Sequence, residues 1–194
     1  MGVAIGVLGD PNTGKSVFTY LLFQEMKEQG KKVFRQEGDP ASPTAPWYLE
    51  TACTDPERAN ELRRKIKTGW CYKSAKWVKD SISGLKKGFD YVLVDLGGGR
   101  PPVERITPEL KLILEEIDKV IILCPKGSDS CVEGWVKELK EKAPHVKIID
   151  ICFSDITAES KVDGECLFGA LDRQLALRLP EHLKRAISKF AMKL

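Results

Sequence analysis

The chain has 194 residues, of which 42% are hydrophobic and 30% are charged. This length suits one domain with a sizeable buried core, and the composition excludes a disordered chain. Thirty-one basic and 28 acidic residues give a net charge of +3, too small to support a nucleic-acid-binding surface. No apolar run reaches the roughly 18 residues of a membrane span, and the first residues carry no basic leader. We therefore expect one domain over residues 1–194, with no membrane segment, in the cytoplasm.

Short strand-like runs alternate with helical patterns along the chain. Strands are predicted at Val3–Leu8, Lys32–Gln36, Phe89–Leu96, Lys119–Cys124 and, as the last, Val146–Phe153. Helices are predicted at Lys15–Gln29, from Asp55-Pro56 to about Thr68, at Tyr72–Lys87, Glu109–Ile117 and Cys131–Lys142, and over most of Leu167–Lys193 with a break at Pro180. A long proline-rich loop is expected from Glu37 to Asp55. This order predicts an α/β fold, with a mainly parallel sheet and helices on both faces.

The segment between the first strand and the first helix carries a phosphate-binding pattern. Gly9–Ser16 reads G-D-P-N-T-G-K-S and matches G-x-x-x-x-G-K-[S/T] in full. The glycines let backbone N–H groups point at phosphates, and the helix N-terminus adds its dipole. We expect Lys15, a loop side chain free of core packing, to reach the β- and γ-phosphates and Ser16 to hold Mg²⁺. A glycine-rich turn that merely caps a helix is the alternative, disfavoured because strand, loop and helix agree. The predicted nucleotide contacts are Gly9, Asp10, Pro11, Asn12, Thr13, Gly14, Lys15, Ser16 and Val17.

A second acidic position is expected to complete the metal site. The apolar run Tyr91–Val94 ends at Asp95, which would lie beside Ser16 at the carboxyl edge of the sheet. Asp95 is therefore predicted to hold Mg²⁺ directly or through water. Gly98 completes a D-x-x-G pattern, whose glycine N–H often faces the γ-phosphate. A strand-terminal aspartate that only forms a turn is the alternative.

The loop after the second strand begins at the same edge. It brings Arg35, Glu37 and Asp39 to the γ-phosphate side, where a carboxylate could orient the attacking group or accept its proton. Asp39 fits this catalytic role and a solvated Gly-Asp-Pro turn equally well. Trp47 and Tyr48 could line an acceptor pocket or anchor the loop to the core, and anchoring is favoured.

Other loops are assigned by their place in this topology. Pro125–Asp129 and Ser154-Asp155 follow the two late strands and are expected to surround the nucleotide base. Arg100 is a candidate mobile cation for transition-state charge, although an ordinary surface arginine is the favoured interpretation. No N-K-x-D or T-K-x-D pattern supports GTP, so ATP is the expected nucleotide.

The six cysteines form no C-x-x-C pair, and His145 and His182 are the two histidines that could join them. A zinc site is therefore not expected. Cys124 and Cys152 lie in apolar strand runs and are interpreted as buried free thiols of a protein in a reducing compartment.

The stretch Gly9–Leu22 resembles the P-loop domain linked, by fusion or neighbourhood, to a CRISPR-associated ring nuclease of cyclic-oligoadenylate signalling. The likeness continues in Gly30–Gln36, Tyr91–Gly98 and Leu167–Arg173. The phosphate loop and the Asp95 strand are shared with the wider superfamily of dethiobiotin synthetase-like and ParA/MinD-like proteins. In dethiobiotin synthetase-like proteins, the loop after the second strand commonly begins with Lys-Pro, whereas this chain has Arg35-Gln36. The ParA/MinD group carries a signature dimerising lysine where this chain has Asp10.

These observations leave two hypotheses. In the first, the chain is an ATP–Mg²⁺ ATPase or phosphotransferase in which Lys15, Asp39 and Asp95 are catalytic. In the second, it is a nucleotide-dependent switch with slow hydrolysis that acts on a protein partner or a second copy of itself. Acceptor-dependent ADP release favours the first hypothesis, and partner-stimulated slow turnover favours the second.

Overall fold

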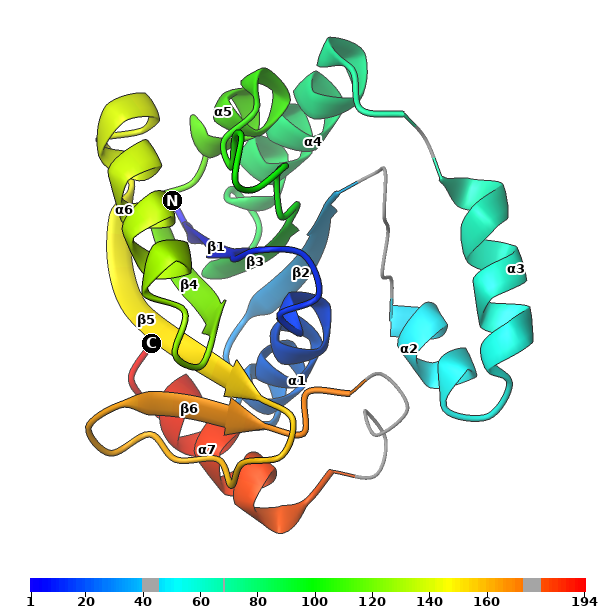
Figure 1. The fold of residues 1–194 in the computed structure, drawn as a ribbon. Helices are drawn as coiled ribbons and strands as arrows, with labels where there is room; N and C mark the ends of the chain where they lie inside the picture. The colour runs from blue at the N-terminus through cyan, green and yellow to red at the C-terminus, as the bar shows by residue number, and fades with distance from the viewer. Residues whose placement is uncertain (40–45, 68, 173–178) are drawn as a thin grey trace.

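A computed structural model describes residues 1–39, 46–67, 69–172 and 179–194 of the chain (Figure 1). Within these ranges a six-stranded sheet has the order β2-β3-β1-β4-β5-β6, and every neighbouring pair is parallel. The strands are β1 (Val3–Leu8), β2 (Val33–Gly38), β3 (Tyr91–Leu96), β4 (Lys119–Pro125), β5 (Lys147–Asp155) and β6 (Cys166–Gly169). The α/β fold with a parallel sheet is therefore confirmed.

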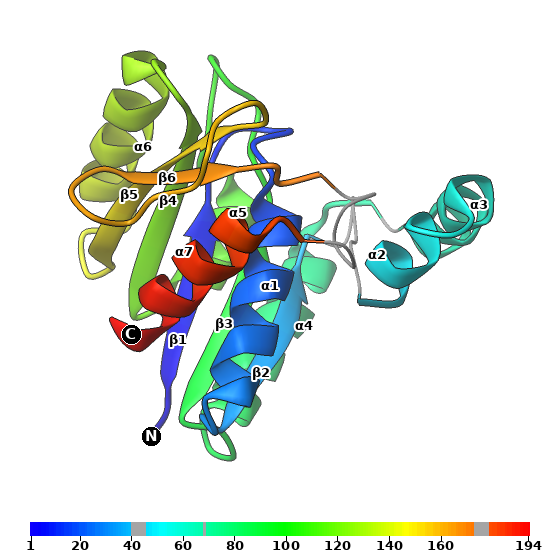
Figure 2. The same ribbon diagram turned by 90° about the horizontal axis from the view of Figure 1, so that it is seen from below.

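Helices cover both faces of the sheet. They are α1 (Lys15–Glu28), α4 (Tyr72–Leu85), α5 (Pro108–Leu114), α6 (Asp129–Lys142) and α7 (Glu181–Met192). Alternation along β1 explains the two layers, because Ile5 and Val7 pack in the core under α1 and α7, whereas Ala4 and Leu8 pack under α4, α5 and α6. Figure 2 shows α1 and α7 side by side on one face. Among the described residues, no helix combines the length and the apolar character needed to cross a bilayer.

A helical arm departs from the sheet between β2 and β3. It consists of α2 (Pro46–Ala52) and α3 (Pro56–Ile66), and both views show it standing away from the other helices (Figures 1 and 2). Asp55 caps α3 as expected, because its carboxylate accepts a hydrogen bond from the N–H of Arg58 at 2.9 Å.

The prediction of a loop from Glu37 to Asp55 is wrong over Pro46–Ala52, which form α2. Residues 46–52 form a helix whose Tyr48 is 3% exposed and belongs to the core cluster. The anchoring role of Tyr48 is confirmed, and Trp47 packs against the same cluster. Positions 40–45 of the predicted loop lie outside the described residues.

The predicted helix over Leu167–Lys193 is also wrong at its start. Cys166–Gly169 is strand β6, paired with β5 in a register that sets Cys152 opposite Cys166, so β5 is not the last strand. A four-residue apolar run is too short for periodicity to separate strand from helix, and here all four residues are buried against the sheet edge. Helix α7 begins only after Pro180, and Arg173 of the quoted likeness lies outside the described residues.

Candidate functional site

The loop from β1 to α1 has the backbone shape that a phosphate cradle requires. Gly14 precedes α1 with φ 85°, a left-handed conformation that glycine adopts without strain, and a Cβ there would lie 2.7 Å from the Cβ of Leu171. Asn12 is also left-handed, with φ 65°, and asparagine tolerates that conformation better than most residues. The first turn of α1 thus faces the open side of the loop with its N–H groups.

Lys15 folds back across this loop. Its Nζ donates a hydrogen bond to the carbonyl of Asp10 at 2.9 Å, and the hydroxyl of Thr13 donates to the same carbonyl at 3.0 Å. Lys15 is only 8% exposed, so the expectation of a lysine free of packing is wrong. Its ammonium group is held over the mouth of the loop, where a phosphate oxygen can replace the carbonyl as acceptor.

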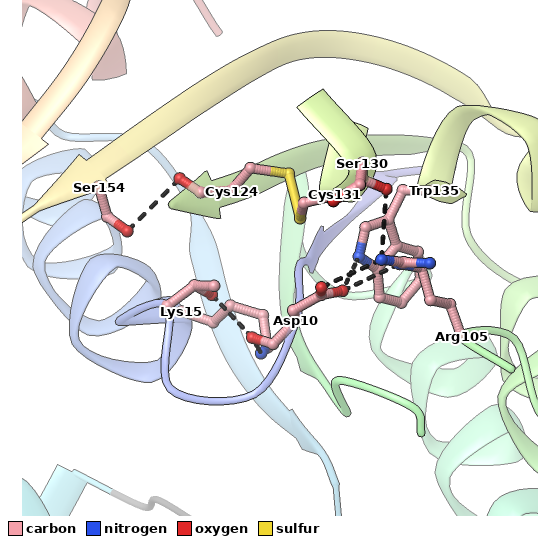
Figure 3. Close-up of a disulfide and its surroundings, with 9 residues drawn as sticks. Asp10, Lys15, Arg105, Cys124, Ser130, Cys131, Trp135 and Ser154 are labelled. Carbon is pink, nitrogen blue, oxygen red and sulfur yellow. Dashed lines mark hydrogen bonds and ion pairs between the residues drawn. A yellow bond between two sulfur atoms is a disulfide. The ribbon is translucent and has the colours of Figure 1, made fainter. Parts of the chain in front are cut away.

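The Asp10 side chain points away from the cradle. Arg105 donates from Nε and Nη2 to the two carboxylate oxygens at 2.9 and 3.1 Å, and Trp135 Nε1 donates to Oδ1 at 2.9 Å (Figure 3). We name this set the Asp10 clamp. The predicted nucleotide contact of Asp10 is therefore limited to its main chain, because its carboxylate is committed to the clamp.

A cavity of about 340 Å³ opens at the carboxyl edge of the sheet, above this loop. Its walls come from the phosphate loop, the ends of β2 and β3, the arm, and the segment after β6. The lining residues are Pro11, Asn12, Gly14, Lys15, Ser16, Val17, Glu37, Asp39, Arg63, Asp95, Leu96, Gly98, Gly99 and Leu171. The structure thus brings together Lys15, Ser16, Asp39 and Asp95, as the sequence predicts.

Asp95 is paired from behind by a buried arginine. Arg35 Nη2 donates to Asp95 Oδ2 at 3.0 Å, and both side chains are almost fully buried. Arg35 therefore does not line the cavity, contrary to its expected place on the γ-phosphate side, and supports Asp95 instead. Because Oδ2 is used by Arg35, Oδ1 is the oxygen that can turn toward a cation near Ser16.

Glu37 and Asp39 lie at the end of β2, across from Asp95. Glu37 is the register partner of Asp95, and its Oε1 accepts a hydrogen bond from the N–H of Asp39 at 3.3 Å. The Asp39 carboxyl is close enough to Gly97 that a Cβ there would lie 3.4 Å from it. Asp39 therefore lies at the wall formed by the turn after β3.

That turn contacts the phosphate loop directly. A Cβ on Gly98 would lie 2.8 Å from the nitrogen of Pro11, so a side chain at position 98 would push the two loops apart. The D-x-x-G pattern thus places the Gly98 backbone at the cavity wall beside the phosphate loop.

A further cavity of about 210 Å³ adjoins the other end of the loop. Asn12, Gly14 and Leu171 line both cavities, and Pro125, Ser154, Asp155 and Ile156 complete the second one together with Thr13 and Phe168. The ends of β4 and β5 therefore line a cavity next to the phosphate loop, and their contact with a nucleotide base stays a prediction.

A smaller cavity of about 100 Å³ lies on the opposite side. It shares Asp39, Gly98 and Gly99 with the main cavity and is otherwise lined by Trp70, Gly97, Arg100, Thr107, Glu109 and Leu110. Arg100 is exposed and faces this smaller cavity, not the main one. The exposure of Arg100 fits the favoured interpretation of a surface arginine, and a role on transition-state charge stays a hypothesis.

The prediction that Cys124 carries a free thiol is wrong. Cys124, at the end of β4, forms a disulfide with Cys131 in α6, and the Ser154 hydroxyl donates to the Cys124 carbonyl at 3.5 Å (Figure 3). The sequence interval of seven spans the turn between β4 and α6, a relation that strand periodicity alone cannot reveal. Cys152 is free and buried, as predicted.

Within the described ranges, one group of side chains has metal-ligand chemistry outside the main cavity. The donor atoms of Asp150, Cys152 and Cys166 lie within 4.8 Å of one another, and Cys166 donates to Asp150 Oδ2 at 3.4 Å. The hydrogen bond with Cys166 and burial raise the pKa of the Cys152 thiol well above its ordinary value. The raised pKa of Cys152 and the hydrogen bond between Cys166 and Asp150 account for this group without a metal ion.

Three residues that line the cavities are far from the phosphate loop in the sequence and were not predicted. Arg63 lies in a run of charged helix residues, Trp70 precedes α4, and Leu171 follows β6. No spacing rule connects them to Gly9–Ser16, because their approach depends on tertiary packing.

Comparison with known proteins supports the fold. No protein-family model and no curated protein matches the sequence. The structure is similar to septum site-determining protein MinD from Pyrococcus horikoshii OT3, solved with Mg-ADP, with a TM-score of 0.68 at 15% identity over 100% of this chain and 96% of that one. A ParA family ATPase from Chlorobium tepidum gives a TM-score of 0.62 at 15% identity, covering both chains fully. The chain therefore has the fold of these P-loop ATPases.

A biosynthetic enzyme shares the same fold. Cobyrinic acid a,c-diamide synthase from Mycobacterium smegmatis, solved with ADP and magnesium, gives a TM-score of 0.54 at 15% identity over 99% of this chain and 93% of that one. The fold is thus shared by a septum site-determining protein, a ParA family ATPase and a cobyrinic acid a,c-diamide synthase, so the fold alone does not define the function.

Proposed function

We propose that this chain binds ATP with Mg²⁺ and cleaves the bond to the γ-phosphoryl group. The observation that carries the proposal is that Lys15 and Ser16 of the phosphate loop line the same cavity as Asp39 and Asp95. Solved structures of the same fold contain Mg-ADP in MinD and ADP, or an ATP analogue, with magnesium in cobyrinic acid a,c-diamide synthase.

The residues around Ser16 fit a hard divalent cation. A serine hydroxyl and carboxylates are the oxygen donors that Mg²⁺ prefers. Ser16 and Asp95 would hold the ion, which when bound neutralises charge on the β- and γ-phosphates. The pair with Arg35 keeps the Asp95 carboxylate in place from the side away from the cavity.

The remaining groups have separate roles. Backbone N–H groups of the phosphate loop and the ammonium of Lys15 bind the phosphate oxygens, and they stabilise the charge that develops as the bond breaks. Asp39 orients the attacking hydroxyl and accepts its proton, while the bond between the γ-phosphorus and the bridging oxygen breaks and ADP leaves.

The smaller cavity favours an acceptor other than water. It begins at Asp39 and Gly98 and extends away from the loop, on the side where the γ-phosphate would lie. An acceptor hydroxyl in this cavity could reach the γ-phosphorus with Asp39 alongside. The phosphotransferase form of the proposal rests on this adjacency, and the regulatory-switch form is the alternative.

The test measures ADP release from Mg·ATP by the wild-type chain, alone and with ribose, adenosine or serine as acceptors, and follows transfer of labelled γ-phosphate. Label on an acceptor supports phosphotransfer, and a Trp70→Ala variant should lose that label while keeping basal ADP release. Label in inorganic phosphate alone supports an ATPase, and slow release that no acceptor changes supports the switch. If the chain neither binds ATP nor releases ADP, the proposal is refuted. If it binds GTP as tightly as ATP, the preference for ATP is refuted.

The partner and the biological setting are finer parts of the same proposal. The resemblance of Gly9–Leu22 supports action beside a CRISPR-associated ring nuclease. Any homodimer would need contacts other than the signature lysine, because Asp10 stands in that position and its carboxylate is held in the clamp. A gene neighbourhood without CRISPR effectors would contradict action beside a ring nuclease. If light scattering finds a monomer at all ATP concentrations, a homodimer is contradicted.

A further inference from the structure

The helical arm brings one of its arginines into the main cavity. Arg63 of α3 lines this cavity together with Lys15 and Asp39, although α3 stands away from the sheet in both views (Figures 1 and 2). Its neighbours Arg64 and Lys65 are exposed, whereas Arg63 is half-buried.

Packing within the arm fixes where Arg63 lies. Its guanidinium carbon lies 5.1 Å from the centre of the Tyr48 ring, within the range of a cation–π contact. Tyr48 is buried, and its hydroxyl donates to Asn60 Oδ1 at 3.1 Å, so the ring is fixed between α2 and α3. The Tyr20 hydroxyl of α1 donates to Glu50 of α2 at 3.4 Å and ties the arm to the helix that follows the phosphate loop.

The charges in the cavity show what such an arginine could do. Glu37, Asp39 and Asp95 contribute carboxylates, and Arg35 is committed to Asp95 behind the wall. Bound ATP with one Mg²⁺ adds roughly two further negative charges at the same place, and the charge on the γ-phosphoryl oxygens is redistributed in the transition state. Lys15 is the cation of the loop, and position 10, beside it, holds an aspartate.

We propose that Arg63 is a catalytic residue that contacts the γ-phosphate of bound ATP and stabilises the transition state of its transfer. The inference rests on the proposed function, since it needs ATP in the main cavity. A guanidinium suits this role because it remains charged and offers several donors in one plane to phosphate oxygens. The contacts of Tyr48 with Arg63 and of Glu50 with Tyr20 hold the arm beside the cavity. The arginine is therefore supplied by this chain's own arm and not by a partner molecule.

The experiment compares Arg63→Ala with Arg64→Ala, an exposed arginine at the next position of the same helix. Arg63→Ala should lower the turnover number on the order of 10³-fold, and Arg64→Ala should change it by less than about twofold. ADP affinity should stay within about twofold in both variants, because ADP lacks the γ-phosphate that Arg63 contacts. Retention of ADP with aluminium fluoride, which mimics the transferring group, should be lost in Arg63→Ala alone.

A folding defect is separated from a catalytic one in two ways. Arg63→Lys should recover part of the turnover, and added guanidinium ion should partly rescue Arg63→Ala but not Lys15→Ala. Normal turnover in Arg63→Ala would overturn the inference while leaving the proposed function intact. An equal loss of ADP affinity and turnover, or equal effects of the two alanine variants, would also overturn it. A wild-type chain that binds no ATP would overturn both.

Discussion

Arg105 holds Asp10 by both carboxylate oxygens, at 2.9 and 3.1 Å, and so fastens the phosphate loop to the segment that follows Gly97, Gly98 and Gly99. Trp135 of α6 donates to the same carboxylate, and Arg105 Nη2 also donates to the Ser130 carbonyl at 3.4 Å. The loop is thus joined on its outer side to two elements that come after β3 in the chain.

Removing the arginine should cost stability. Arg105→Ala leaves the partly buried Asp10 carboxylate with Trp135 as its clamp partner, and we expect a loss of about 3 kcal/mol in the free energy of unfolding. Urea unfolding measures this, with the exposed Arg100→Ala on the same segment as a control that should change stability by less than about 0.5 kcal/mol. Equal, small effects of both substitutions would show that the clamp adds nothing.

Lys15→Ala should abolish tight ATP binding. Its Nζ is held over the mouth of the loop by the Asp10 carbonyl, so its loss removes the cation nearest the phosphates. Titration calorimetry with ATP checks this, and Lys27→Ala, an exposed lysine of the same helix, should bind ATP normally. Unchanged affinity and turnover in Lys15→Ala would exclude the phosphate-loop interpretation.

Asp95→Asn should separate metal dependence from nucleotide binding. The amide keeps the shape but not the charge that balances Mg²⁺, so Mg²⁺-dependent turnover should fall far more than nucleotide affinity without metal. Asp90→Asn, at an exposed position just before β3, should leave both unchanged. Equal, small effects of Asp95→Asn on both quantities would make Asp95 a support for Arg35 only.

Asp39→Asn distinguishes a catalytic carboxylate from a turn residue. If Asp39 orients the attacking group, turnover should fall by about 10²–10⁴-fold with ATP affinity little changed. If it only closes the turn, asparagine serves equally well and turnover stays intact. A Mg²⁺ titration of binding and turnover decides, and lost affinity at high Mg²⁺ alone would make Asp39 a metal ligand.

Glu138 should contribute a pH-dependent part of the stability. Desolvation acts to raise its pKa, but hydrogen bonds from the N–H groups of Ile106 and Arg105 and from Lys142 outweigh it and hold the pKa below the ordinary 4.5. The unfolded chain binds this proton more readily, so the stabilisation is complete above about pH 4.5 and is lost as the pH falls through the lowered value. Glu138→Gln should therefore reduce stability at neutral pH and flatten its decline in acid, as followed by thermal unfolding between pH 7 and 3. The same slope in both proteins would contradict this.

Much of the site could be predicted because it is local in sequence. Gly9–Ser16 lies between one strand and one helix, and the parallel order brings the ends of β2 and β3 to the same edge, so Asp39 and Asp95 follow from topology. The same rule brings the ends of β4 and β5 to this edge, beside the second cavity.

The rest depends on contacts that no periodicity encodes. The sequence shows Asp10 only as a residue of the phosphate loop, because its partner Arg105 lies 95 positions later in the chain. Cys166–Gly169 is a strand because β5 offers an open edge, and Arg63 reaches the cavity because α2 and α3 form a packed pair around Tyr48. In each case the partner lies on an element whose place is set by tertiary structure, so the local sequence carries no signal.

The central position of β1 has a consequence for how the chain matures. Its neighbours in the sheet are β3 and β4, and the first pairing joins Val3 to Tyr91. During synthesis at about 5–20 residues per second, the first strand therefore emerges several seconds before any strand that can flank it, roughly 4–18 s for the intervening stretch. Its apolar side chains, followed directly by the phosphate loop, remain without a sheet partner for that time. Burial of β1 therefore depends on non-local pairing, and its apolar side chains can be enclosed only after β3 has been synthesised.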